Sequence, residues 1–170
     1  MEHNATVVLF YGGYGIQIDR ENFMIPVDAR IWRESNVERD GVGIKPLLSK
    51  LKQVGGGAEI VVIDASRRNP FERRFREYSH GLAPIGAPDN ALVVTSELPD
   101  RIAYDSNDRN SVLVSEVIEK LSGPNRSADA IFNDALLDVA RKSHGEQVPM
   151  VSSSLVADVN LRPPAVHNGN

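Results

Sequence analysis

Short apolar runs alternate along this chain with segments that carry an apolar helical face. The runs are rich in β-branched residues, as in strands buried on both faces, and they lie at residues 6–11 (TVVLFY), 59–64 (EIVVID) and 91–96 (ALVVTS). The helical faces include Ile44, Leu47, Leu48 and Leu51 before Gly55, and similar spacing recurs over residues 114–121 and 132–139. Strands interleaved with helices of about a dozen residues predict an α/β fold with a largely parallel sheet.

Shorter patterns predict the secondary structure of the remaining segments. Residues 15–19 and 22–27 flank a polar stretch, which suggests a hairpin. Asn110 and Ser127 can cap the two later helices, and residues 151–155 form a last candidate strand. The glycine run at residues 55–57 is interpreted as the terminus of the helix that precedes it.

The loops after the three apolar runs are where function is expected. In parallel sheets, functional loops sit at the carboxyl ends of the strands. That rule selects residues 12–15, 65–71 and 97–108.

Composition narrows the classes of function. A length of 170 residues fits one domain, and a net charge of −4 gives no reason to expect nucleic acid as a partner. The chain contains no cysteine, which excludes disulfides and a cysteine nucleophile, and its four histidines are scattered. We therefore expect no metal and no cofactor. No apolar run approaches the roughly 20 residues that cross a bilayer, so we expect no membrane partner and a cytoplasmic location.

Four segments resemble one family in order and spacing. FYGGYGIQIDRENFMIPVDA (10–29) resembles the FYxxHGxQ…NYLIPxDA segment of the metacaspases and orthocaspases, which are bacterial and lower-eukaryotic caspase relatives. VVIDASRRNPF (61–71) resembles their VxxLDACRxNPF segment. GLAPIGAP with ALVVTSELPDRIAYD (81–105) and GEQVPMVSSSL (145–155) are similar to two later motifs. The resemblance implies a caspase-like three-layer αβα sandwich over residues 1–162, with a flexible tail at 163–170.

The resemblance also assigns roles to particular positions. Tyr14 stands where the family has its general-base His, and Ser66 where it has its nucleophilic Cys. Asp64 matches an acidic residue that helps to bind a basic P1 side chain, and Asp105 lies in the region that supplies a second acidic contact. Asp64 can equally be a structural carboxylate that accepts backbone N–H bonds in the next loop.

A glycine loop and a missing segment complete the comparison with the family. Gly12, Gly13 and Gly15 match the loop that would bring backbone N–H groups towards an oxyanion. The family domain normally starts with two strand–helix units before this strand, whereas here the strand starts at about residue 6. We therefore expect an apolar flank on that strand, covered by an N-terminal segment, another polypeptide or a second copy of the chain.

The pair of substitutions argues against catalysis. A serine hydroxyl needs a base that accepts its proton during attack, and histidine suits that task because its pKa is near 6.5. A normal tyrosine titrates near 10, so a phenol at position 14 would donate to Ser66 at neutral pH. Arg67 and Arg68 are close in sequence and could assist ionisation. His80 could replace the imidazole, although a surface loop histidine is the simpler interpretation.

These observations predict a catalytically inactive caspase homologue that binds a peptide or protein, including one with basic side chains, and regulates an active relative. One alternative is a weak serine-type endopeptidase that cleaves after Arg or Lys. Another is an assembly module without a working pocket. A serine introduced by mutagenesis would also explain Ser66, but it would leave Tyr14 unexplained.

Overall fold

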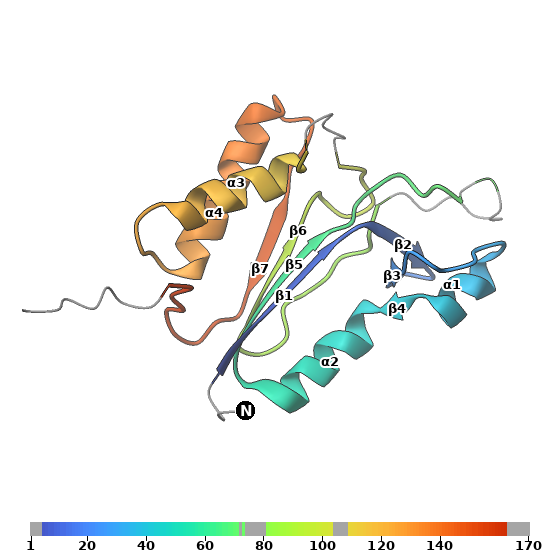
Figure 1. Cartoon of the computed structure of the whole chain (residues 1–170), viewed down its shortest axis with the longest axis horizontal. Coiled ribbons are helices and arrows are strands. Elements are labelled where there is room, and N and C mark those ends of the chain that lie inside the picture. Colours follow the sequence, from blue (N-terminus) through green and yellow to red (C-terminus); the bar gives the residue numbers. More distant parts are fainter. Residues whose placement is uncertain (1–4, 72, 74–80, 104–108, 163–170) are drawn as a thin grey trace, which may run out of the picture.

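The computed structural model of the protein describes residues 5–71, 73, 81–103 and 109–162. Its main sheet has four strands in the order β1-β5-β6-β7 (Figure 1). Their bounds are Ala5–Gly12 for β1, Gly56–Asp64 for β5, Ala91–Thr95 for β6 and Met150–Ser153 for β7. β1, β5 and β6 run parallel, and β7 is antiparallel to β6. The predicted mostly parallel sheet is therefore confirmed.

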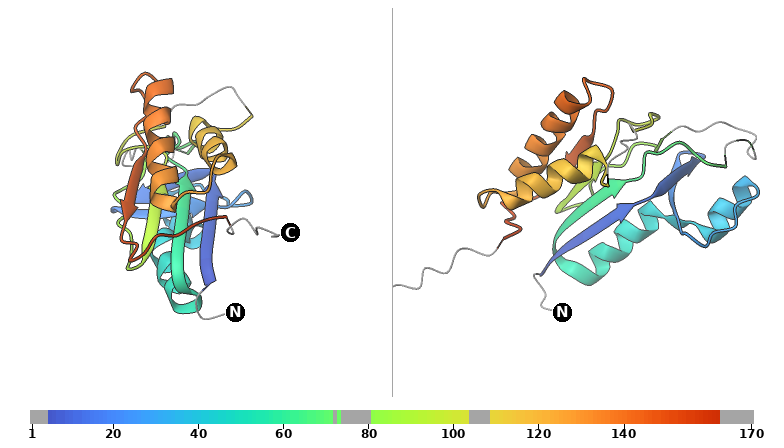
Figure 2. Two further views of the ribbon diagram at one scale, coloured as in Figure 1. Left: turned by 90° about the vertical axis from the view of Figure 1, so that its left-hand side faces the viewer. Right: turned by 45° about the horizontal axis from the view of Figure 1, so that its top comes forward.

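Helices cover both faces of this sheet (Figure 2). They are α2 (Ile44–Gly55) on one face, and α3 (Val112–Ser122) with α4 (Ala128–Lys142) on the other. Alternation along β5 divides the core, because Val61 and Ile63 pack with Leu48 of α2, whereas Val62 packs with Phe132 of α4. The expected three-layer αβα arrangement is confirmed.

A second sheet follows β1 and has the order β2-β3-β4. Its strands are β2 (Tyr14–Ile18), β3 (Glu21–Ile25) and the short β4 (Val42–Gly43), and α1 (Glu34–Asp40) precedes β4. Asp19 and Arg20 join β2 to β3 with φ values of 49° and 62°, as in a two-residue hairpin turn. The hairpin is confirmed, whereas α1 and β4 were not predicted.

One local prediction was wrong and another held only in part. Helix α3 is capped by Ser111 and not by Asn110, because the Ser111 hydroxyl accepts the N–H of Val114 at 3.1 Å. Helix α2 ends at Gly55 as predicted, but the rest of the glycine run belongs to β5, which begins at Gly56 and pairs there with Ala5 of β1. A backbone pairing partner thus outweighs the low strand propensity of glycine.

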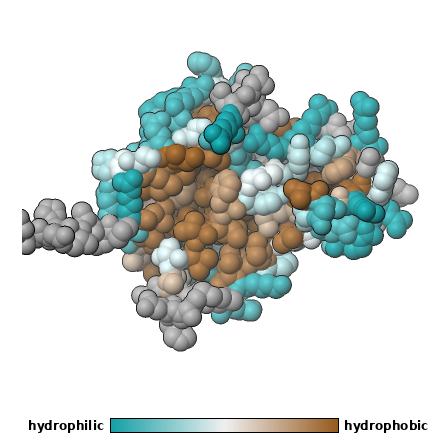
Figure 3. Space-filling view, in the orientation of Figure 1, coloured by the Kyte–Doolittle hydropathy of each residue, from teal (hydrophilic) through white to brown (hydrophobic). Residues whose placement is uncertain are grey.

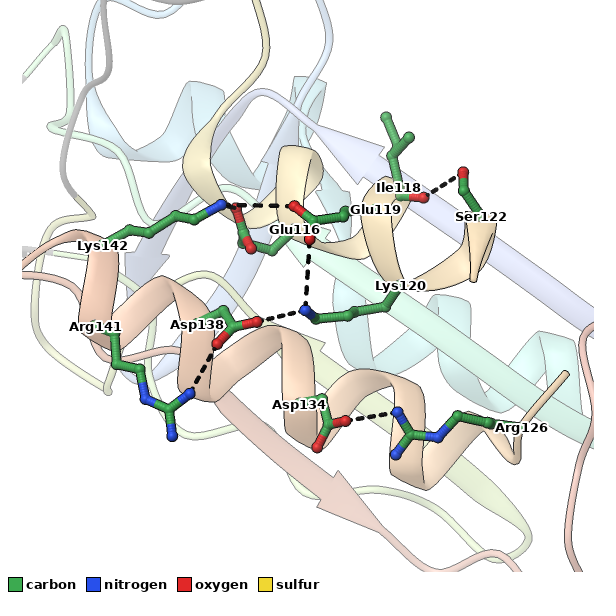
Figure 4. Close-up of polar contacts among 10 residues, drawn as sticks. All are labelled: Glu116, Ile118, Glu119, Lys120, Ser122, Arg126, Asp134, Asp138, Arg141 and Lys142. Carbon is green, nitrogen blue, oxygen red and sulfur yellow. Dashed lines mark hydrogen bonds and ion pairs between the residues drawn. The ribbon is translucent and has the colours of Figure 1, made fainter. Parts of the chain in front are cut away.

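Charged side chains join α3 to α4 (Figure 4). Lys142 of α4 lies 2.5 Å from the buried Glu116 of α3, and Lys120 of α3 lies 2.5 Å from Asp138 of α4. The hydrogen bond from Lys120 holds the pKa of the Asp138 carboxyl below its usual range, and the same contact raises the pKa of Lys120. These contacts hold α3 beside α4, and α3 carries part of the cleft described below.

β1 forms one edge of the main sheet and leaves apolar side chains uncovered. Leu9 and Tyr11 pack towards α2, so the alternate residues point to the opposite face. On that face Val8 is 59% exposed and Phe10 is 57% exposed. Figure 3 shows a broad hydrophobic surface between α3 and α2, on the side where β1 lies. The apolar flank expected from the sequence is present on β1.

Candidate functional site

The three loops selected from the sequence meet at one end of the main sheet. The Gly13 N–H donates to the Asp64 carbonyl at 3.2 Å, and the Gly15 N–H donates to the Ala65 carbonyl at 2.9 Å. The Ser66 N–H donates to the Ser96 hydroxyl at 3.2 Å. These bonds connect the segments that follow β1, β5 and β6, as the parallel order of the strands requires.

Tyr14 begins β2 and stands at the surface, where it is 48% exposed. The Tyr11 hydroxyl fixes the backbone of Tyr14, because it donates a hydrogen bond to the Tyr14 carbonyl oxygen at 2.9 Å. The same hydroxyl accepts the N–H of Ile25 at 3.0 Å. Burial raises the pKa of Tyr11, so this phenol keeps its proton and remains a donor at neutral pH. Sequence reasoning had treated Tyr11 only as part of a strand.

Ser66 lies on the inside of the same region and is 0% exposed. Its hydroxyl has no hydrogen-bond partner among the described residues. Its carbonyl accepts the N–H of Ala103 at 2.6 Å, so the backbone on both sides of the side chain is fixed. Tyr14 and Ser66 lie next to the hydrogen bond that joins Gly15 to Ala65, but no hydrogen bond joins their own side chains.

The glycine loop is held against the strand that precedes Ser66. The N–H groups of Gly13 and Gly15 are both used by carbonyls of that strand end, as described above. A Cβ on Gly15 would lie 2.6 Å from a Leu82 methyl and 2.9 Å from the Ala65 carbonyl oxygen. A glycine is needed at this position because the two backbone segments approach so closely. In this arrangement the two N–H groups do not point towards a substrate carbonyl.

Asp64 ends β5, and its carboxylate is already paired. Nη2 of Arg67 lies 3.3 Å from one oxygen and 3.4 Å from the other. The two side chains are only 4% and 19% exposed, so solvent screens this ion pair little. The basic side chain expected at Asp64 is thus supplied by the chain itself in this structure.

An open cleft of about 530 Å³ lies over these residues. It falls within the range of roughly 300–1,000 Å³ that is typical of ligand sites. Its lining comes from three segments and comprises Phe10, Gly12, Gly13, Tyr14, Asp64, Arg67, Arg68, Arg109, Asn110, Ser111 and Val114. Ser66 is not among these residues. The cleft can therefore accommodate a peptide segment, but it does not present the hydroxyl to that segment.

A buried polar network beneath the site was missed by sequence reasoning. Gln147 donates its side-chain N–H to the Ser96 carbonyl at 2.7 Å, and Ser96 in turn holds Ser66. The buried Glu97 carboxylate accepts the N–H groups of Leu98 at 2.8 Å and of Val148 at 3.1 Å. The GEQVP segment carries the family resemblance, so Gln147 could have been selected from it. No comparable signal marks Glu97.

Two predicted residues lie outside the described part of the chain, namely Asp105 and His80. Within the described part, no group of three or more histidines, aspartates or glutamates is arranged to hold a metal ion. Nor does that part contain a helix with the length and hydrophobicity of a membrane span.

The comparison with known families agrees with this architecture. The family model described as the caspase domain (Peptidase_C14) matches residues 1–160. The match extends over nearly the whole chain, so the chain belongs to the caspase-domain family, a family of peptidases and their homologues. No curated protein matches the chain.

Proposed function

We propose that this chain is a catalytically inactive member of the caspase-domain family that acts by binding a peptide or protein segment, in the metacaspase and orthocaspase branch and in the cytoplasm. The observation that carries the proposal is the environment of Ser66. The hydroxyl is fully buried and has no hydrogen-bond partner in the part of the chain that the structure describes, and position 14 offers a phenol in place of an imidazole. Hydroxyl nucleophiles in hydrolases require an accessible oxygen and an adjacent base.

Loss of oxyanion donors supports the same proposal. Acyl transfer is accelerated by N–H groups aimed at the developing negative charge, and removing one such donor costs about 10²–10³ in rate. The N–H groups of Gly13 and Gly15 are bound to carbonyls, and that of Ser66 is bound to Ser96. An active serine endopeptidase would have to break these contacts in every turnover.

The binding half of the proposal rests on the cleft, and an NMR titration tests it. The probes are N-acetylated tetrapeptide amides that carry Gln, Glu or Arg at one position. At least one should shift the amide signals of Gly12, Gly13 and Ser111 in a saturable way, because these residues line the cleft. The amide of Ala135, buried in α4, should not move.

A matched pair of variants on α3 controls this titration. Val114 lines the cleft, whereas Ile118 lies one turn further along the helix and is exposed outside it. Val114→Trp should therefore weaken the binding at least about tenfold by filling the cleft, while Ile118→Trp should leave it unchanged. Absence of cleft shifts with all three peptides would favour the assembly module over the peptide-binding protein.

The open edge of β1 supports a second proposal about partners. Edge strands present unpaired N–H and C=O groups, and Val8 and Phe10 add exposed apolar surface to that edge. In a solution of the purified chain, only a second copy is present to cover this face. We therefore propose that the chain associates with itself through β1 when no other segment covers the strand.

A further inference from the structure

We propose that Arg67 is an internal ligand of the cleft, whose guanidinium occupies the acidic subsite formed by Asp64 and thereby excludes basic side chains of a bound peptide. The statement about peptides rests on the function proposed above. The occupancy itself rests only on contacts within the chain, so the two can fail separately.

The local backbone brings Arg67 back over Asp64. The Arg67 N–H donates to the Ala65 carbonyl at 2.8 Å, which closes a tight turn directly after β5. Both side chains line the cleft, and Nη2 of Arg67 is within 3.4 Å of both carboxylate oxygens. The contact is made by one nitrogen of the guanidinium, which lies between the two carboxylate oxygens, and a charged donor in this position strengthens the interaction.

Burial makes this partner necessary for Asp64. A carboxylate whose side chain is 4% exposed loses most of its hydration, and it is tolerated when a cation and hydrogen bonds replace the water. Arg67 supplies this cation from a position three residues away. A peptide arginine would have to compete with a group that is always present at high effective concentration.

Two further arginines of the cleft also act against the binding of basic side chains. Arg68 and Arg109 line the same cleft and are exposed. With Asp64 already neutralised by Arg67, further positive charge disfavours the approach of a basic peptide. The cleft as built therefore suits segments with neutral or acidic side chains, and Arg67 is the residue that sets this specificity.

Chemical rescue provides the test. In Arg67→Ala, and in Arg67→Gln as a variant that keeps the side-chain bulk, the carboxylate of Asp64 is left without its guanidinium. The melting temperature should fall in both variants, because a buried charge has lost its partner. N-acetylarginine amide should raise it again in a saturable manner and should shift the Asp64 amide signal. N-acetylcitrulline amide, the uncharged isostere, should have no effect.

Three further samples complete the design. The wild-type chain should bind N-acetylarginine amide at least about tenfold more weakly than Arg67→Ala, since its subsite is filled. Asp64→Asn combined with Arg67→Ala should not respond, because the carboxylate is gone. Arg68→Ala removes a positive charge from the same cleft without opening the subsite, so any gain in binding of the arginine amide should stay well below that of Arg67→Ala.

Several results would overturn the inference. These are equal binding of the arginine amide by the wild type and Arg67→Ala, no response in either Arg67 variant, or rescue that persists without Asp64. If the arginine amide does not rescue the Arg67 variants but peptides still shift the cleft signals of the wild-type chain, the role of Arg67 is wrong and the proposed peptide binding stands. Peptide hydrolysis by the wild-type chain removes the proposed inactivity and leaves the rescue result standing.

Discussion

A cysteine introduced at Ser66 should react with a small alkylating reagent roughly a hundredfold more slowly than a cysteine introduced at an exposed position, because reaction requires local opening of the buried site. The chain has no cysteine of its own, so each variant carries a single thiol. Ser66 is fully buried, whereas Ser49 on α2 is exposed and provides the comparison. The rates are followed by mass spectrometry of the intact Ser66→Cys and Ser49→Cys proteins.

Whether Ser66→Cys reacts more slowly or faster than Ser49→Cys distinguishes a buried side chain from an activated nucleophile. A site built to activate a thiol lowers its pKa and accelerates its reaction. Faster alkylation of Ser66→Cys than of Ser49→Cys would therefore contradict the burial that underlies the proposed inactivity. Addition of denaturant should make the two rates equal, which confirms that the folded environment causes the difference.

Replacing the exposed apolar residues of β1 with lysine should abolish self-association. The wild-type chain should show a molar mass that increases with concentration in light scattering coupled to size exclusion. Val8→Lys combined with Phe10→Lys should remain monomeric throughout. Burying each of these side chains contributes about 1.5–3 kcal/mol, so losing both weakens association by at least roughly a hundredfold. Lysine also protects sheet edges from pairing.

An exposed leucine away from the sheet edge controls for a general effect of added charge. Leu137 of α4 is exposed and does not lie on β1, so Leu137→Lys should associate like the wild type. A wild-type chain that stays monomeric at all concentrations contradicts association through β1. So does a Val8 and Phe10 variant that associates as strongly as the wild type.

The sheet and its layers could be predicted because their signals are local and strong. β5 and β6 contain the apolar runs IVVI and ALVV, and the spacing of Ile44 and Leu48 marks the buried face of α2. α1 was missed because it has seven residues and buries only Asn36 and Val37, too few to establish a helical period. The cap of α3 was misplaced by one residue because Asn110 and Ser111 are both good capping residues and only geometry decides between them.

The sequence predicted where the candidate residues lie in the fold but not which contacts they make, and their functional roles stay predictions. The resemblance selected Tyr14, Ser66 and Asp64, which the loops do bring to one end of the sheet. It could not show that the Ser66 hydroxyl faces inwards, since burial depends on the packing of distant segments. Nor could it show that Arg67 turns back onto Asp64, because a neighbouring position in sequence does not fix the direction of a side chain.

Hydrolysis of peptides tests the central claim most directly. Fluorogenic substrates with Arg or Lys at the cleaved position would be incubated with the purified chain, with and without calcium, beside a Ser66→Ala variant. The chain is predicted to release no more fluorophore than Ser66→Ala under either condition, because the hydroxyl is buried and position 14 carries no imidazole. Turnover by the wild-type chain that disappears in Ser66→Ala would contradict the proposed inactivity and establish a serine-type peptidase instead.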